Sequence, residues 1–437
     1  MNRQQRAAAA LCADIARRLA DPDRVREQLP EPPDSVHALT LSDGLPGIAL
    51  LHLELGADGD ADARHTAHRW LSEAVTRART APQDTPGLYR GVPALSFALT
   101  RAALIAGRPL KAADRLADQV RTFARSLAAW ERRRRPQDGV CVTIGTYDVI
   151  SGLAGLGAHL LDDPGRPEAL AEVLTALTGL TEPLRPDGRA LPGWWTAQLR
   201  TGLARATVET GHANVGLAHG IPGPLALLAL AREAGVTVAG QDEAIRAMAQ
   251  WLLSVRQFAA DGPWWPRTMV LETDGAVVAK DTTPGRPSWC YGTAGIARAL
   301  YLAGRALDVP EWRDTAVTAL RAALADAGRA HETRAAGRLE DAGLCHGWSG
   351  LLQATWRMAN DTGDATLRAA LPWLADRILE LAAPEAPFGL VPPTSDGNIT
   401  SDPAGFLTGA AGTALALRTF ATDTAPVTGW DRGLLLG

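Results

Sequence analysis

The sequence predicts an all-α protein with the architecture of an α/α toroid, a double-layered helical barrel of seven helical hairpins. The first observation is a glycine theme that occurs seven times and each time opens an Ala- and Leu-rich stretch of helical length. The second is the interval between copies, which is 47 to 72 residues. The copies are GLPGIALLHLEL from Gly44, GVPALSFALTRAAL from Gly91, GLAGLGAHLL from Gly152, GIPGPLALLAL from Gly220, GTAGIARALYLAG from Gly292, GWSGLLQATWRMA from Gly347 and GAAGTALALRTF from Gly409. Six of them read Gly-x-x-Gly, and the second has Ala94 in place of the second glycine.

The segments between these copies read as amphipathic helices. In KAADRLADQVRTFARSLAAW (111–130) and DTAVTALRAALADAGRA (314–330), apolar residues recur every three or four positions, as they do in a helix with one buried face. Each repeat is therefore predicted to be an outer helix, a loop, and an inner helix that begins at a glycine pair. The inner segments are nearly all apolar, so we expect them to be buried on most faces.

The glycines at the inner-helix starts are expected to allow positive φ angles and a close approach of neighbouring backbones. No such hairpin buries its own apolar face, so successive hairpins must stack until the core is continuous. Closure into a ring gathers the N-termini of the inner helices, with their dipoles, at one rim; an open solenoid is the alternative. Residues 1–437 are predicted to form one domain, with a short ribbon at 275–280 (GAVVAK) and with Pro-rich loops at 182–193 and 383–403 as additions to it.

Composition and charge exclude several classes of protein. Hydrophobic residues make up 46% of the chain and the net charge is −4, which allows a large core and argues against a nucleic-acid-binding protein. The basic run ERRRR (131–135) is predicted to be a solvated helix end, with docking of an acidic peptide as the alternative.

The N-terminal segment MNRQQRAAAALCADIARRLADPDR (1–24) has spaced charges and reads as an amphipathic helix rather than a signal peptide. No apolar run reaches the roughly 18 residues of a membrane span, so an integral membrane protein is not expected. The four cysteines are scattered, which argues against a disulfide framework and favours a cytoplasmic enzyme with reduced thiols.

Polar residues beside the glycine pairs become neighbours if the pairs share one rim. Those beside the third to sixth copies are Asp148, His212, His219, Arg286, Trp289, Cys290, Tyr291, Asp341, Cys345, His346 and Trp348. His212 is expected to be structural. Six tryptophans near the rim are expected mostly to plug junctions between loops and helices, with an aromatic groove for an extended peptide as the alternative: Trp194, Trp195, Trp264, Trp265, Trp289 and Trp348.

Cys290, Cys345 and His346 form a candidate set of three zinc ligands. Each cysteine stands two residues before the first glycine of a repeat. Catalytic zinc commonly has three protein ligands and one open position, and two thiolates with one imidazole suit this ion. Isolated cysteines are often small buried hydrophobic residues instead, which is the expectation for Cys12 and Cys141.

Four motifs together resemble the LanC family, the lanthionine synthetase cyclases of lanthipeptide biosynthesis: SWCYGTAG (288–295), LCHGWSG (344–350), LAHGIPG (217–223) and YDVISGLAG (147–155). The resemblance spans the seven repeats. It implies an α/α toroid that holds one zinc ion per chain through Cys290, Cys345 and His346. It also implies catalytic roles for His219, Asp148, Arg286 and Tyr291. The small extra domain of some members has little room here, because only 61 residues separate the second and third copies.

The implied reaction adds a cysteine thiol of a precursor peptide to a dehydroalanine or dehydrobutyrine of the same peptide. Zinc favours the thiolate, which is the nucleophile. His219 is expected to protonate the resulting enolate and Asp148 to orient the imidazole, while Arg286 or Tyr291 donates to the enolate oxygen. For His219, Asp148 and Tyr291 the structural alternatives are a hydrogen bond at a helix start, an N-terminal cap and wall packing. Expected partners are the dehydrated precursor peptide and, as further candidates, a lanthipeptide dehydratase and a transporter.

Two other functions are consistent with these residues. A LanC-like protein that binds zinc and thiols without closing rings would keep the three ligands. Another zinc–thiolate transferase on an α/α toroid, as in protein prenylation, would be expected to use an Asp-Cys-His ligand set and a basic diphosphate pocket, which the sequence does not display. His219 and Asp148 favour the cyclase.

Overall fold

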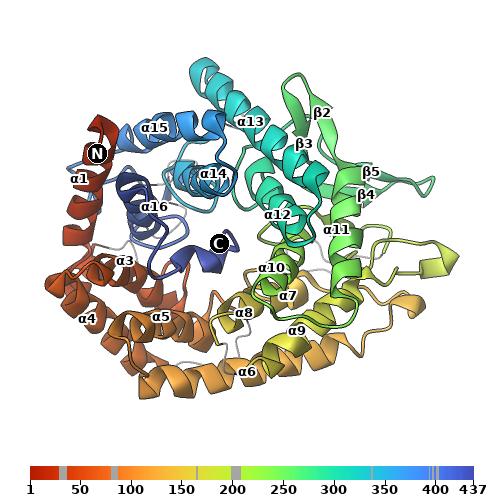
Figure 1. The fold of residues 1–437 in the computed structure, drawn as a ribbon, viewed down its shortest axis with the longest axis horizontal. Helices are drawn as coiled ribbons and strands as arrows, with labels where there is room; N and C mark the ends of the chain where they lie inside the picture. Colours follow the sequence, from red (N-terminus) through yellow and green to blue (C-terminus); the bar gives the residue numbers. More distant parts are fainter. Residues whose placement is uncertain are drawn as a thin grey trace. The chain divides into compact units, whose positions relative to one another are not determined.

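The computed structural model describes residues 1–28, 37–79, 87–163, 166–197, 208–335, 338–392, 394–395, 398–399 and 403–437. Outer and inner helices alternate along the chain (Figure 1). The outer helices are α1 (Arg3–Arg18), α4 (Ala61–Ala78), α6 (Lys111–Glu131), α9 (Glu168–Thr178), α11 (Gln241–Val255), α13 (Pro310–Thr333) and α15 (Ala365–Leu379). The inner helices are α3 (Leu45–Ala57), α5 (Gly91–Ala106), α8 (Leu153–Leu160), α10 (Pro222–Glu233), α12 (Thr293–Ala306), α14 (Trp348–Thr362) and α16 (Ala410–Thr422). Each inner helix begins at the first glycine of its copy or one or two residues after it, so the second glycine of each pair lies in the first turn of the helix.

Short helices and strands fill the connections. The short helices are α2 (Pro22–Glu27), η1 (His37–Leu39), η2 (Pro136–Asp138), α7 (Ile144–Tyr147), η3 (Gly179–Thr181), η4 (Pro186–Gly188) and η5 (Trp430–Leu434). The strands are β1 (His212–Asn214), β2 (Gln257–Ala259), β3 (Gly262–Trp264), β4 (Thr268–Leu271), β5 (Val277–Ala279), β6 (Thr394–Ser395) and β7 (Asn398–Ile399). The ribbon predicted at 275–280 is confirmed as β5, which pairs antiparallel with β4, and β4 pairs in turn with β1. Part of the Pro-rich loop predicted at 383–403 lies outside the described residues.

The chain divides into two compact units. The first contains Met1–Val120, Arg338–Arg432 and Gly437, and the second contains Arg121–Gly337 and Gly433–Leu436. In the first unit the inner helices pack in the order α5, α3, α16, α14, and α4, α1 and α15 pack against them (Figure 1). In the second unit α8, α10 and α12 pack side by side, and α9, α11 and α13 cover them.

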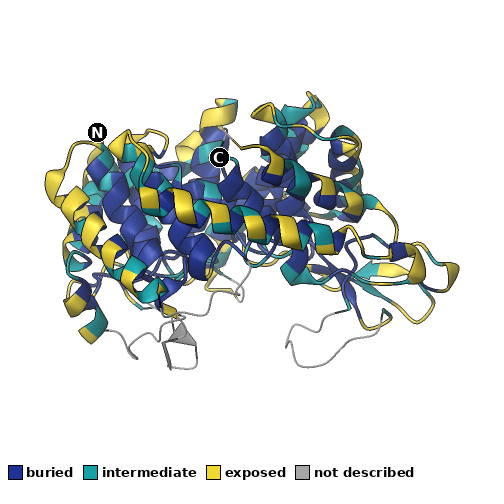
Figure 2. Ribbon diagram, turned by 90° about the horizontal axis from the view of Figure 1, so that it is seen from below, coloured by how far each residue is buried: buried dark blue, intermediate teal, exposed yellow. Residues whose placement is uncertain are grey.

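The outer and inner helices differ in burial as predicted. The outer helices are striped, with buried residues on one face and exposed residues on the other (Figure 2). On α6 the buried stripe is Ala113, Leu116, Val120, Ala124 and Ala128, with helical spacing. Nearly every residue of the inner helix α16 is buried. The six rim tryptophans are all buried, as junction plugs are.

The start of α1 is built as its sequence predicts, and the end of α6 is so only in part. Asn2 and Gln5 form a capping box at the start of α1, so residues 3–18 are an amphipathic helix. In the basic run after α6, the guanidinium of Arg134 pairs with Glu131 at 2.5 Å and both side chains are almost fully buried. The run lies at the end of α6, where Arg132, Arg133 and Arg135 are exposed, but the buried Arg134–Glu131 pair differs from the solvated end that was predicted. No helix within the described ranges combines the length and apolar character needed to cross a membrane.

The glycines of the repeats allow backbone segments to approach each other closely. The expectation that these glycines have positive φ angles was wrong for most of them. The N-cap glycines Gly44, Gly152, Gly292, Gly347 and Gly409 have φ between −91° and −114°. Gly91, which opens the copy that has Ala94 in place of the second glycine, has a positive φ of +60°. A Cβ on Gly412, in the first turn of α16, would lie 1.8 Å from the carbonyl oxygen of Phe406. The loop before the helix therefore coils back onto the helix start, where only a residue without a side chain fits.

Gly412→Ala is expected to lower the free energy of unfolding by about 3 kcal/mol, because the loop backbone must move away from the new methyl group. Urea unfolding of the full chain measures the change. Gly328→Ala is the matched control, since a Cβ there meets nothing within 4 Å and the residue lies inside α13. That control should be neutral or stabilising by about 0.5–1 kcal/mol. Equal stability of both variants would contradict the close-approach explanation.

Candidate active site and metal centre

Asp148 stands between α7 and α8 and serves two neighbours with its two carboxylate oxygens. Its Oδ1 accepts a hydrogen bond from the backbone N–H of Ser151 at 2.8 Å, and its Oδ2 lies 2.6 Å from Nδ1 of His219. The first contact holds the loop before α8, whose N-cap is Gly152 without a side-chain cap, so it is not the helix cap predicted as an alternative. The second contact is consistent with the predicted orienting role. Both are present in one side chain, because a carboxylate has acceptor sites on two oxygens.

Burial affects the two members of the Asp148–His219 pair differently. Asp148 is 1% exposed, and removal from water raises the pKa of its carboxyl group, although the hydrogen bond from His219 and backbone N–H groups oppose that rise. The His219 side chain is 34% exposed. His219 is therefore the member of the pair that can reach a substrate, while Asp148 fixes the ring from behind.

Tyr291 lies against the imidazole of His219. The two ring centroids are 5.9 Å apart and the planes are inclined by 33°. Nδ2 of Asn214 donates a hydrogen bond to the Tyr291 hydroxyl at 3.2 Å, and Oδ1 of Asn214 accepts from the backbone N–H of Gly216 at 2.9 Å. Asn214 is 2% exposed. It is a site residue that the sequence reasoning missed; its signal was a polar side chain inside HANVGLAHG, six residues before a repeat glycine.

Backbone contacts hold these loops together within the second unit. The N–H of Val149 donates to the carbonyl of Ala218 at 3.0 Å, and the N–H of Ala218 donates to the carbonyl of Cys290 at 3.2 Å. A Cβ on Gly216 would lie 2.5 Å from the Cys290 carbonyl oxygen and 2.6 Å from the Tyr291 ring. The absent side chain of Gly216 thus lets the loop that carries His219 close onto the loop that carries Cys290.

In the first unit, Cys345 and His346 lie immediately before α14. The N–H of Cys345 donates to the carbonyl of Leu407 at 2.8 Å, which ties this loop to the start of α16. Nε2 of His346 lies 3.5 Å from Oδ2 of Asp341, whose Oδ1 accepts from the N–H of Gly343 at 2.9 Å. An imidazole oriented by a carboxylate at one nitrogen is the usual arrangement of a metal-ligating histidine.

The three predicted zinc ligands, Cys290, Cys345 and His346, form a group that could hold a metal ion. Two thiolates and one imidazole fit zinc in their chemistry. The Ser288 hydroxyl lies 3.6 Å from Sγ of Cys290 and can hydrogen-bond to that sulfur. The donor set therefore fits the predicted metal.

Two predicted residues are not part of these contacts. The Arg286 side chain is exposed, and among the described residues no hydrogen bond or ion pair links its guanidinium to Asp148, His219 or Tyr291. His212 is buried in β1, where it pairs in register with Val270 of β4, as expected for a structural residue.

Comparison with known proteins identifies the fold class and then the family. A solved structure of nisin cyclase matches this chain with a TM-score of 0.70 at 22% sequence identity, covering 92% of each chain. With the mostly helical structure, this likeness confirms the predicted α/α toroid. The family model described as lanthionine synthetase C-like protein matches residues 35–435. The chain belongs to the lanthionine synthetase C-like family, which confirms the resemblance read from the four motifs.

A curated relative is also similar over much of its length. The nisin biosynthesis protein NisC of Lactococcus lactis subsp. lactis is 24% identical over 323 residues, which are 72% of this chain and 72% of the relative.

Proposed function

We propose that this protein is a zinc-dependent lanthipeptide cyclase that forms thioether rings in a dehydrated precursor peptide. The observation that carries the proposal is the pair of Asp148 and His219, whose facing atoms are 2.6 Å apart, beside Tyr291 in the loop that also holds Cys290. Membership in the family and the likeness to nisin cyclase support it.

The proposed reaction balances without an oxidant or reductant. The peptide thiol loses its proton, its sulfur bonds to the β-carbon of a dehydroamino acid, and the α-carbon gains a proton. One zinc ion per chain, held by Cys290, Cys345 and His346, would supply a position at which the peptide thiol ionises at neutral pH.

The chain's own residues would supply the remaining steps. His219 would deliver the proton to the α-carbon, and Asp148 would keep its ring oriented through Nδ1. Tyr291 accepts a hydrogen bond from Asn214, and its hydroxyl would donate to the enolate oxygen. Arg286 is the second proposed donor, and its exposed side chain would meet the bound peptide rather than the His219 pair.

The substrate partner in this proposal is the dehydrated precursor peptide, with a dehydratase and a transporter as further candidate partners. The single domain over residues 1–437 and the cytoplasmic location stay predictions. The same ligand set would also serve a LanC-like zinc- and thiol-binding protein, but binding alone gives no reason for an oriented imidazole beside the metal ligands.

Alkylation of peptide thiols after incubation separates a cyclase from a binding protein. The full-length protein is incubated with the dehydrated precursor peptide and then unfolded in the presence of iodoacetamide. A cyclase leaves the peptide mass unchanged and removes alkylatable thiols, because each ring consumes one thiol. The same precursor without dehydration is the matched control and should keep all its thiols. Complete alkylation of the dehydrated peptide, at the level seen without protein, would overturn the proposal.

A further inference from the structure

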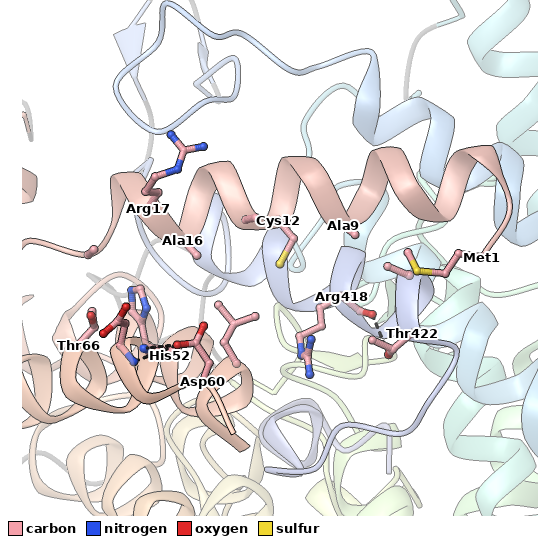
Figure 3. Close-up of a pocket in the computed structure, with 16 residues that line it drawn as sticks. Met1, Ala9, Cys12, Ala16, Arg17, His52, Asp60, Thr66, Arg418 and Thr422 are labelled. Atoms are coloured by element: carbon pink, nitrogen blue, oxygen red, sulfur yellow. Dashed lines mark hydrogen bonds between the residues drawn. The ribbon is translucent and has the colours of Figure 1, made fainter. Parts of the chain in front are cut away.

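A separate cavity of about 490 Å³ lies in the first unit, among α1, the last turns of α3 and α16, and the start of α4 (Figure 3). The last turn of α16 is at the far end of that helix from Leu407, whose carbonyl bonds Cys345. With a rise of about 1.5 Å per residue, the 13 residues of α16 place the cavity roughly 20 Å from that metal ligand. The cavity is therefore not part of the site described above.

The wall of the cavity is mostly apolar. Helix α1 lines it with the small side chains of Ala9, Cys12, Ala13 and Ala16 and with Arg17, and Met1 and Ala20 line it just outside the two ends of that helix. Leu55 and Ala63 add apolar surface from α3 and α4. The volume falls within the range of small-molecule sites, which are largely apolar with a few placed polar groups.

His52 presents an unused acceptor to this cavity. Its Nε2 donates to the carbonyl oxygen of Leu19 at 3.0 Å, so the hydrogen is on Nε2 and the lone pair is on Nδ1. No other described residue bonds to His52, which is 2% exposed. Burial lowers the pKa of His52 to about 4, so the ring is neutral at pH 7.

Cys12 and Arg418 also carry polar atoms without partners. The Cys12 thiol is 3% exposed and points from α1 into the cavity (Figure 3). Burial raises the pKa of Cys12 to about 12, so the thiol is neutral at pH 7. Nε of Arg418 is buried and has no partner in the described part of the chain.

Several of the charges around the cavity are already engaged. Arg17 pairs with Asp14, the Arg418 Nη2 group pairs with Asp58, and Asp60 accepts from two N–H groups at the start of α4. Asp62 and Met1 also line the cavity. Between Cys12 and His52 the wall offers an apolar surface and neutral polar atoms.

We propose that this cavity binds a small uncharged molecule with a mostly apolar body and an O–H or N–H group that donates to Nδ1 of His52. Nδ1 of His52 has no hydrogen-bond partner among the described residues, and a ligand with one donor at this position would supply one. The proposal rests on the first unit alone and does not depend on the cyclase function.

Binding of indole and of 4-methylphenol to the full-length protein tests the proposal by calorimetry. Both probes combine an apolar ring with one donor, and each has a methylated counterpart without it, 1-methylindole and 4-methylanisole. At least one donor probe should bind with one site per chain and about fivefold more tightly than its counterpart, as one neutral hydrogen bond predicts. Failure of both donor probes to bind at millimolar concentration, as expected for a cavity that holds only water, would overturn the proposal.

Ala13→Phe and Ala10→Phe locate the binding site. Both residues are exposed on α1, but Ala13 lines the cavity and Ala10 is not among its lining residues. Ala13→Phe should weaken probe binding at least tenfold by filling the cavity, and Ala10→Phe should leave it unchanged. Equal binding by the two variants, or equal affinity for each probe and its methylated counterpart, would refute the assignment.

Discussion

Cys290→Ala and Cys345→Ala are each expected to lose most of the bound zinc, from about one ion per chain, and to reduce ring formation by about a thousandfold or more. Each substitution leaves two protein ligands, which hold zinc far less tightly than three. We expect loss of the sulfur atoms to affect the metal rather than the fold, because the two loops are held by backbone bonds from Cys345 to Leu407 and from Ala218 to Cys290. Zinc content by mass spectrometry and the alkylation assay measure the two effects.

Cys141→Ala provides the matched control for these variants. Cys141 is a half-buried free cysteine outside the ligand set, so its removal should leave the zinc content and the activity unchanged. Thermal unfolding of all three variants shows whether the fold survives. Full zinc retention by Cys290→Ala or Cys345→Ala, with an intact fold, would contradict the ligand assignment.

The helical architecture is readable from the sequence because two local rules act together. A helix buried on all sides must be apolar all round, and a loop that folds back onto its own helix start excludes a side chain at the contact, as at Gly412 against Phe406. These rules mark each inner helix and its first turn. These rules do not predict the backbone angles. A close approach of two backbones can require glycine at a negative φ, just as a left-handed turn requires glycine at a positive φ. The presence of a glycine in the sequence therefore does not tell which of these two causes applies.

The site is only partly readable for a similar reason. The repeat placed Asp148 and His219 at equivalent helix starts, which is why residues 71 apart could be predicted to meet. Asn214 reaches Tyr291 from β1, a three-residue strand whose position depends on pairing with β4. A strand of this length is too short to show a periodic pattern of apolar residues in the sequence. The cavity beside Cys12 could not be predicted from the sequence either, because a cysteine looks the same in a sequence whether its side chain is tightly packed or faces a cavity.

His219→Ala is expected to keep its zinc and to form rings at least about a hundredfold more slowly, because the enolate loses its proton donor. His219 is one-third exposed and its removal leaves the backbone contacts of its loop in place, so stability should change little. Ring formation is followed under single-turnover conditions, together with zinc content and peptide affinity. Undiminished ring formation would remove His219 from the mechanism.

Asp148→Asn separates orientation of the imidazole from the hydrogen bond that Asp148 accepts in the loop before α8. The side-chain oxygen of the amide in this variant can still accept from the Ser151 N–H, but the amide NH₂ group now donates toward Nδ1 of His219 and favours the opposite tautomer. We expect a loss of about a hundredfold in the rate of ring formation with normal stability, and little further loss when His219→Ala is added, because the two residues act as one unit. Losses that multiply in the double variant would show that Asp148 acts through a contact other than the 2.6 Å bond to His219.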